Sequence, residues 1–297
     1  MNNEKPIPST EAILLHQHTS GAATKKFLSG GRRRFAQNIP GVIGLFVVAV
    51  YLLVAVFGPL FTLDPNRTNL LDSLTDSGIA GTDPLGRDIF ARVVEGGRVA
   101  LFVAFVSTAL GMLMAMVLGV AAGYFGGFVD EILSRIFDVI LTFPMLLLGV
   151  LIVLAMGPSI LTVAIAIAIA IMPRLGRQFR AETLSCVQRE YVQAVKAQGY
   201  SSIRIILRHV LPNVWLPVTM LAAGNMGRVA VSEASLSYLG AGVEAPNASW
   251  GNMISEGQAY LQVNPGIVLW PGFALLILAI AFSFVGDALR DAYDLTE

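Results

Sequence analysis

Charged residues are scarce in this sequence of 297 residues, and their scarcity decides the broad class of the protein. Asp, Glu, Lys and Arg make up 13% of the chain, whereas a typical soluble domain carries about 25%. Hydrophobic residues make up 55%, and the mean hydropathy is +0.69. The sequence therefore predicts an integral membrane protein. The 20 basic and 20 acidic residues cancel, so the total charge indicates no particular partner.

Cysteine and histidine, which supply many catalytic and metal sites, are nearly absent. The single cysteine, Cys186, cannot form an internal disulfide. None of the three histidines belongs to a His-Glu-x-x-His motif, and neither a Gly-x-Ser-x-Gly motif nor a Gly-x-x-x-x-Gly-Lys-Ser/Thr phosphate loop occurs. We therefore predict that this chain is not an enzyme, with no catalytic residue, no metal site and no ATP hydrolysis of its own.

Long runs without charge account for much of the remaining sequence. The first, at 35–63, follows a polar or mixed segment and so differs from a signal peptide, whose apolar part is about 7–15 residues long and lies near the start. The run at 139–173 is too long for one crossing at about 1.5 Å per residue, and the Gly-Pro pair at 157–158 divides it. The pattern predicts an all-α integral membrane protein with six transmembrane helices, at 39–61, 99–123, 138–156, 159–176, 213–238 and 267–286.

Lys and Arg predict the orientation. One basic cluster precedes the first span, and a second, at 174–208 with seven basic residues against two acids, begins at the end of the fourth span and continues toward the fifth. Four crossings separate the clusters, so both indicate the cytoplasmic side. The predicted parts are a cytoplasmic N-terminal segment 1–34, a first transmembrane helix 35–63, an external segment 64–98, a transmembrane core 99–290 with a cytoplasmic loop at 177–212, and a cytoplasmic C-terminus 291–297.

The loop at 177–212 shows helical periodicity on both sides of a glycine. Gly199 is suited to a left-handed stop, and Pro212 marks the start of the next span. We therefore predict a helix, a tight elbow and a second helix. Periodicity alone also allows an inert loop that its arginines hold at lipid headgroups. The predicted apolar stripes are Leu184, Val187, Tyr191 and Val195, followed by Ile203, Ile206, Leu207, Val210 and Leu211.

The residues of this elbow resemble a known signature. "QAVKAQG" at 193–199, nine further residues and "HVLP" at 209–212 resemble the Glu-Ala-Ala signature of the membrane subunits of bacterial ATP-binding-cassette (ABC) importers. Gln193, Val195 and His209 depart from it, replacing an acid, an alanine and an isoleucine. Further stretches, in order along the chain, resemble the second, six-span permease type of the dipeptide, oligopeptide and nickel importer branch: "GTDPLGRDIFARVVEGGRVAL" (81–101), "GYFGGFVDEILSRIFDVILTFPMLLL" (123–148), "EASLSYLGAGVEAPNASWGNMI" (233–254) and "GDALRDAYD" (286–294).

This resemblance implies a type I ABC importer-like transmembrane domain in the bacterial inner membrane, working by alternating access, with 64–98 in the periplasm. It implies four kinds of contact: a homologous second permease, two ATPase subunits that bind ATP and Mg, a periplasmic or lipid-anchored substrate-binding protein, and membrane lipid. No feature indicates nucleic acid. Di- or oligopeptides are the expected substrates, while nickel chelates, glutathione-like peptides, opines and sugars stay open. The positions implied to couple the chain to the ATPases are Gln193, Ala194, Val195, Gly199, Leu211 and Pro212.

The external segment 64–98 mixes arginines with acidic residues. A divalent cation would favour such carboxylates, but their spacing does not resemble an EF-hand loop. A local Arg-Asp network, or part of a surface that receives a soluble binding protein, is favoured. Residues 242–265, with Trp250 and Tyr260, are expected to belong to the same surface.

Arg228 and Glu233 are charged residues inside the fifth predicted span, where a functional role is the default expectation. Because they are five residues apart, they do not form a simple pair on one helix face. Each either lines a translocation pathway or pairs with another helix or the second permease. Two other classes remain as alternatives: a secondary transporter, although no internal repeat is evident, and a channel subunit, which would not need an ATPase-docking elbow.

Overall fold

The computed structural model describes residues 31, 33–75, 77–244 and 246–293. The predicted N-terminal segment 1–34 and C-terminus 291–297 therefore lie largely outside the described residues. Across the described ranges the chain is helical, with one isolated bridge between Thr82 and Asp88. The α-helices are α2 (Ile39–Phe57), α3 (Ile89–Phe125), α4 (Gly127–Thr142), α5 (Met145–Met156), α6 (Ile160–Val187), α7 (Glu190–Ala197), α8 (Ser202–Ile205), α9 (Leu211–Tyr238), α10 (Trp250–Gly257) and α11 (Gly266–Tyr293). Shorter turns are the 3-10 helices Gly58–Leu60, Leu70–Asp72 and Gln258–Tyr260 and the π-helix Ile206–Val210.

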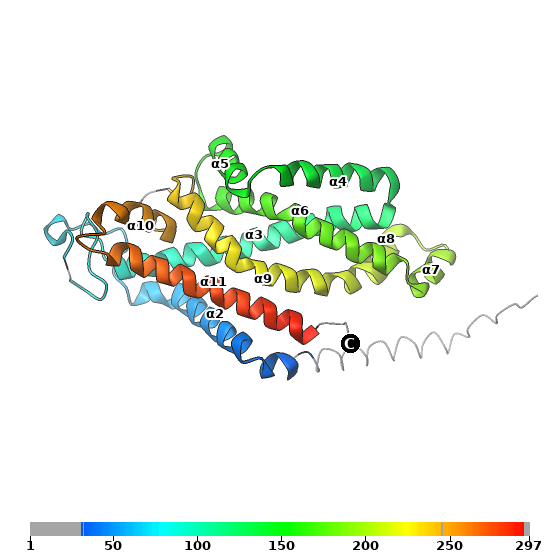
Figure 1. The fold of residues 1–297 in the computed structure, drawn as a ribbon, viewed down its shortest axis with the longest axis horizontal. Helices are drawn as coiled ribbons and strands as arrows, with labels where there is room; N and C mark the ends of the chain where they lie inside the picture. Colours follow the sequence, from blue (N-terminus) through cyan, green and yellow to red (C-terminus); the bar gives the residue numbers. More distant parts are fainter. Residues whose placement is uncertain (1–30, 32, 76, 245, 294–297) are drawn as a thin grey trace, which may run out of the picture.

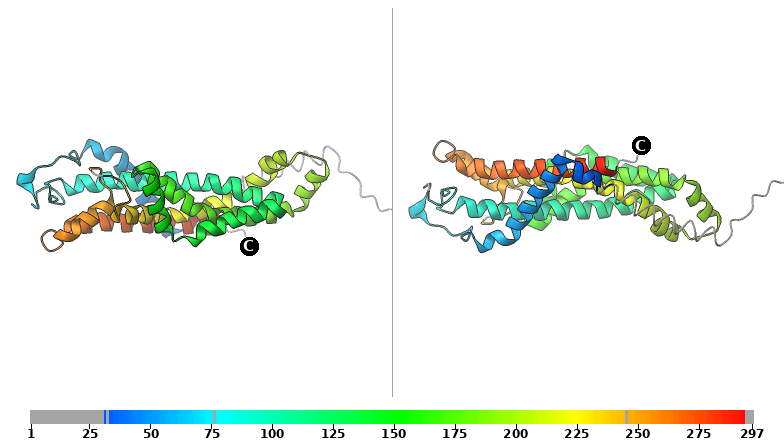
Figure 2. Two further views of the ribbon diagram at one scale, coloured as in Figure 1. Left: turned by 90° about the horizontal axis from the view of Figure 1, so that it is seen from above. Right: turned by 90° about the horizontal axis from the view of Figure 1, so that it is seen from below.

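The helices form an elongated bundle with two different ends. In Figure 1, α7 and α8 project at one end, and α10 lies at the other beside the loop that joins α2 to α3. The views from above and from below in Figure 2 show the same arrangement. We call the first the elbow end (residues 188–201) and the second the loop end (residues 61–88 and 239–265).

Five helical segments are long and apolar enough to cross a membrane. They are Ile39–Leu60, Ile89–Phe125, Ile160–Val187, Ser202–Tyr238 and Gly266–Ala292. A sixth is obtained when α4 and α5 are counted together as one broken span. The predicted all-α membrane fold is confirmed, with five long helices in the described ranges and six spans when the bent α4–α5 pair is counted as one.

The third predicted span, 138–156, differs from the structure in its bounds, because it corresponds to a bent pair of helices that begins earlier. α4 already begins at Gly127, and the axes of α4 and α5 differ by 94° across a break at Phe143 and Pro144. Pro144 disfavours helical backbone at the residue before it, and Phe143 is extended, with φ −80° and ψ 131°. The proline therefore separates the two helices, and in Figure 1 α5 turns away from the line of α4.

Two helices extend well beyond their predicted spans at the elbow end. α6 continues to Val187, so the interlude expected from residue 177 is partly helix. The second elbow helix and the fifth span are one continuous helix, Ser202–Tyr238. Pro212 is accommodated because a π-turn precedes it, in which the N–H of Leu211 donates to the carbonyl oxygen of Ile206, five residues back.

Close packing of α3 against α6 forms the centre of the bundle. A Cβ atom at Gly123 would lie 2.7 Å from the carbonyl oxygen of Arg180, and one at Gly119 would overlap the carbonyl oxygen of Gly176. The two glycines are four residues apart and so lie on one helix face. Small residues at this spacing let membrane helices approach closely, where van der Waals contact replaces the hydrophobic effect as the main attraction.

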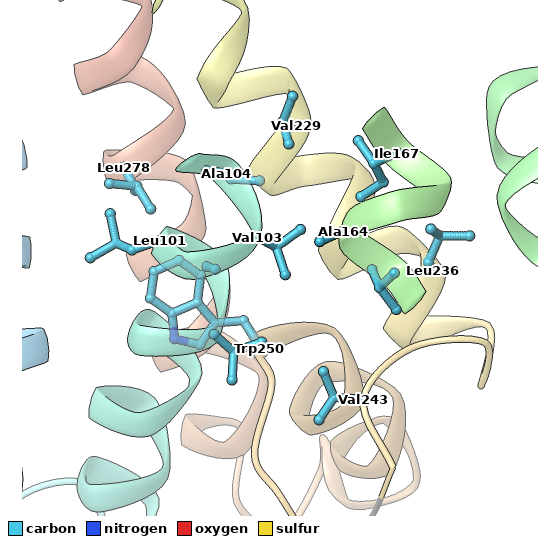
Figure 3. Close-up of a cluster of buried hydrophobic side chains, with 14 of the residues drawn as sticks. Leu101, Val103, Ala104, Ala164, Ile167, Val229, Leu236, Val243, Trp250 and Leu278 are labelled. Atoms are coloured by element: carbon cyan, nitrogen blue, oxygen red, sulfur yellow. The ribbon is translucent and has the colours of Figure 1, made fainter. Parts of the chain in front are cut away.

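A buried cluster near the loop end joins α3, α6, α9 and α10. Trp250 of α10 is 1% exposed and lies against Gly96 and Gly97 of α3, and its indole N–H donates to the carbonyl oxygen of Val93 at 2.9 Å. Figure 3 shows this indole beside Leu101 and Val103. The cluster fixes the position of α10 on the bundle.

We expect Gly119→Ala to destabilise the bundle by about 1–3 kcal/mol, the usual cost of overpacking a close contact. The matched control is Gly272→Ala, because a Cβ atom at Gly272 would meet nothing within 4 Å. The variants are purified in detergent and heated, and size-exclusion chromatography measures the fraction that stays folded at each temperature. The two unfolding midpoints are then compared. Equal midpoints for the two variants would contradict the close packing of α3 on α6.

Candidate functional site

The elbow end is built from α7 and the two turns that flank it. α6 ends at Val187, and α7 begins after Arg189, whose backbone is extended with φ −68° and ψ 140°. This break resets the helix phase, so the buried residue of α7 is Val192, which is 1% exposed, and not Tyr191, which is 39% exposed. The first predicted apolar stripe is therefore wrong in its register across the break.

The second predicted stripe is also only partly correct. Val210 is buried, but Ile203 and Leu207 are 70% and 60% exposed, while Ile205 is buried instead. In the π-turn at Ile206–Val210 the backbone hydrogen bond joins residues five apart, one more than in an α-helix. This wider turn shifts the buried face of the helix. Val192, Ile205 and Val210 belong to one apolar cluster that holds α7 against the continuous helix Ser202–Tyr238.

Side-chain contacts also tie α7 to the end of α6. The amide nitrogen of Gln193 donates to the carbonyl oxygen of Val187 at 2.8 Å, which satisfies an acceptor at the end of α6. A carboxylate could not donate this hydrogen bond, which gives a physical reason for glutamine where the signature has an acid. The hydroxyl of Tyr191 lies 3.4 Å from the Cys186 sulfur, and partial burial raises the pKa of Tyr191 to about 12.

The remaining positions of the signature lie on both sides of this turn. Ala194 and Gly199 are exposed, and Val195 is half-buried. Gly199 has φ +79°, and a Cβ atom there would meet nothing within 4 Å, so the backbone conformation and not a lack of space favours glycine. Leu211 and Pro212 lie at the start of α9, beyond the π-turn. The structure thus places four of the six positions at the elbow end, whereas Leu211 and Pro212 lie beyond it, at the start of α9.

A cavity of about 780 Å³ lies midway along the bundle. Its walls come from the α4–α5 break at Phe143 and Pro144 and from α3, α6, α9 and α11. Most of its lining is apolar, but Arg174 of α6 and Arg228 of α9 both face it. Volumes of roughly 300–1,000 Å³ with a few polar groups are typical of small-molecule sites.

Arg228 and Glu233 have different surroundings. Arg228 is exposed and lines the cavity, whereas Glu233 is fully buried and is not among the lining residues. The hydroxyl of Ser237 donates to one Glu233 oxygen at 2.8 Å, and the other oxygen has no partner in the described part of the chain. The two residues therefore do not share one site in this chain.

Ion pairs at the loop end join the two predicted external segments. Asp83 accepts from Arg87 at 2.5 Å and lies 3.7 Å from Arg92. Both arginines also face Glu256 of α10, at 3.0 and 3.8 Å. The carboxylate of Asp83 further accepts from the backbone N–H groups of Leu85 and Arg87, at 2.9 Å each. The predicted Arg-Asp network is confirmed, and it connects the loop to α10.

The sequence did not identify Glu256 or Arg174 as site residues. Glu256 lies in a stretch with no charge pattern of its own, and only the fold brings it to the arginines. Arg174 follows Pro173 near the end of the predicted fourth span and belongs to the basic cluster that predicts the orientation. An arginine two residues inside a span boundary was the available signal.

Comparison with known proteins identifies the fold. The methionine ABC transporter MetNI, solved in inward-facing conformations, matches with a TM-score of 0.55 and 18% identity over 69% of this chain and 97% of that one. An amino acid ABC transporter crystallised with histidines matches with a TM-score of 0.52 and 15% identity over 67% of this chain and 92% of that one. The fold is therefore that of the transmembrane subunit of an ABC importer.

Sequence comparisons place the chain in a family. Residues 115–295 match the family model of the binding-protein-dependent transport system inner membrane component, and residues 27–75 match the N-terminal transmembrane domain of oligopeptide transport permease C. The chain belongs to this family of inner membrane transport components, as a multi-pass permease subunit.

Relatives within the family carry names of peptide transport systems. The dipeptide transport system permease protein of Alkalihalophilus pseudofirmus is 38% identical over 88% of each chain. The oligopeptide permease protein of Bacillus subtilis is 34% identical over 88% of this chain and 87% of its own length. The glutathione transport system permease protein of Pectobacterium atrosepticum is 33% identical over 89% of each chain.

We expect Asp83→Asn to lower the free energy of unfolding by about 3 kcal/mol, because it leaves two buried guanidinium groups without their central carboxylate. The control, Glu95→Gln, removes the partner of Arg98 in an exposed pair and should cost less than about 1 kcal/mol. Thermal unfolding in detergent separates the two cases. If both variants have the same unfolding midpoint, the buried network does not stabilise the loop end.

Proposed function

We propose that this chain is the permease subunit of an ATP-driven, binding-protein-dependent importer of di- or oligopeptides, in which it forms half of the translocation pathway. The observation that carries the proposal is the connection between the elbow and the cavity. α7 is joined by short turns to α6 and to the continuous helix Ser202–Tyr238, and both helices line the cavity. The peptide substrate class is supported by the names of the dipeptide and oligopeptide relatives.

In this proposal α7 is the coupling helix that docks on an ATPase subunit. Ala194 and Gly199 are exposed and small, which permits close approach by a partner, while Val192 and the Gln193 hydrogen bond keep α7 attached to its own chain. Two ATPase subunits bind ATP and Mg, and their closure displaces α7. Because α6 and α9 extend from the elbow to the cavity as helices, the displacement moves the cavity walls and alternates their access.

The remaining partners follow from the two ends of the bundle. The elbow end faces the cytoplasm, with the N- and C-termini, since the basic clusters indicate this side. The loop end faces the periplasm and receives a substrate-binding protein on the surface that α10 and the loop at 64–88 form. A homologous second permease completes the pathway beside Arg228. Glu233 is instead buried where α9 packs against the rest of the bundle.

We expect Gly199→Asp to abolish peptide uptake and the co-purification of the ATPase subunits while leaving membrane insertion intact. The charged side chain would project from the exposed elbow into the docking interface. Gly240→Asp is the matched control: Gly240 also has φ +79° and open space around its Cβ position, but it lies at the loop end. The backbone cost of about 1–2 kcal/mol is then the same in both.

A mild-detergent pull-down with mass spectrometry, together with an uptake assay, measures both effects. The proposal predicts two ATPase chains and a second permease with the wild type and with Gly240→Asp, and loss of the ATPases with Gly199→Asp. Recovery of the chain alone from wild-type membranes would instead favour a transporter or channel without ATPase partners.

We also expect the two ends to be labelled from opposite sides of the membrane. In a Cys186→Ala background, Ala194→Cys and Leu71→Cys place single thiols at exposed positions of the elbow end and the loop end. A membrane-impermeant maleimide should label Leu71→Cys in intact spheroplasts and Ala194→Cys only after lysis. The reverse pattern would overturn the proposed orientation.

A further inference from the structure

Two guanidinium groups face the central cavity. Arg174 comes from α6 and Arg228 from α9. Both side chains are exposed, and in the described part of the chain no carboxylate oxygen lies within 4.0 Å of either. The cavity lining contains no acidic residue from the described ranges. The described part of the chain therefore brings two positive charges to the cavity and no compensating negative charge.

The other polar groups of the lining are largely occupied. The side chains of Asn225, Ser232 and Ser283 donate to carbonyl oxygens one turn earlier on their own helices, at 2.6, 2.8 and 3.1 Å. Thr108 differs, since its buried hydroxyl has no partner among the described residues. Among the described lining residues, the charged donors open to a ligand are therefore the two guanidinium groups, beside the second N–H of the Asn225 amide, and such donors suit an anion.

Both arginines lie well inside their helices. Arg174 is 14 residues from the start of α6 and Arg228 is 10 residues before the end of α9, which is roughly 21 and 15 Å from those helix ends. A charged side chain within a membrane-spanning helix is usually accompanied by a counter-charge or water. Guanidinium pairs with carboxylate through two parallel hydrogen bonds, the geometry that makes arginine the usual carboxylate ligand.

We propose that Arg174 and Arg228 bind the C-terminal carboxylate of a peptide as it occupies the cavity. This inference rests on the proposed peptide importer function and specifies its substrate class: peptides with a free terminal carboxylate. The apolar walls accept side chains of different kinds, while the guanidinium groups recognise the one group that such peptides share. Specificity at this site is then for the terminus and not for the side chains.

The test uses the complete complex in proteoliposomes, with the second permease, the ATPases and the binding protein. Uptake of radiolabelled alanyl-phenylalanine is compared for the wild type, Arg174→Gln, Arg228→Gln and Arg228→Lys. Arg98→Gln serves as the control, since it removes an exposed arginine outside the cavity. We expect each glutamine variant to lower uptake at least about tenfold, the effect of losing a charge-assisted hydrogen bond, while ATP hydrolysis stimulated by the binding protein persists. Arg228→Lys should restore part of the uptake, and Arg98→Gln should leave it unchanged.

A second measurement separates carboxylate binding from the selectivity of the binding protein. Without the binding protein, alanyl-phenylalanine should raise the thermal midpoint of the wild-type complex, and its C-terminal amide should not. The double variant Arg174→Gln/Arg228→Gln should lose this difference. Equal responses to the acid and the amide in the wild type, or full uptake by the double variant, would overturn the inference.

The remaining outcomes identify other counter-charges and also overturn the inference. Loss of the second permease from the Arg228→Gln complex would show that the arginine pairs with an acid of that subunit. Release of a bound anionic phospholipid by the double variant, seen by native mass spectrometry, would assign the arginines to a lipid phosphate. Absence of any peptide uptake by the wild-type complex would instead refute the proposed function itself.

Discussion

Backbone hydrogen bonding constrains this molecule most strongly, because a lipid environment offers no water to unpaired N–H and C=O groups. The chain meets this constraint with continuous helices, and two of them continue beyond the predicted membrane limits to the elbow. Only residues 188–189 and 198–201 interrupt the helical path from α6 through α7 to the helix Ser202–Tyr238. A force on α7 therefore acts on two continuous helices that form part of the cavity walls, and little flexible chain lies between α7 and these helices to absorb it.

The two ends of the bundle are stabilised by different interactions, and the difference suits the proposed transport cycle. At the loop end, buried ion pairs around Asp83 and the packing of Trp250 hold α10 and the α2–α3 loop to the bundle. At the elbow end, α7 buries Val192 and leaves the rest of its surface mostly exposed. One end is thus a fixed platform, while the other retains a free face for a partner.

The sequence predicted the features that depend on composition and short-range pattern. Charge-free runs predicted the spans, helical periodicity predicted an elbow between the fourth and fifth of them, and Gly199 predicted its turn. It failed where a local break changes the helix phase: the extended backbone at Arg189 and the π-turn before Pro212 rotate the buried face by an amount that periodicity cannot supply. The cavity could not be predicted from the sequence either, because Arg174 and Arg228 are 54 residues apart. Only the packing of α6 against α9 brings both side chains to the same cavity.

Rigid coupling between α7 and the cavity wall is the central claim, and a distance measurement tests it directly. Spin labels at Ala194 and Val231, in a Cys186→Ala background, report the distance from α7 to the cavity-lining face of α9 by pulsed electron paramagnetic resonance. A third label on the second permease reports how α9 moves across the pathway. The account predicts that the Ala194–Val231 distance is the same with and without bound nucleotide, while the distance from Val231 to the second permease changes. A change in the first distance with no change in the second would show that α7 moves independently of the cavity, and would contradict the account.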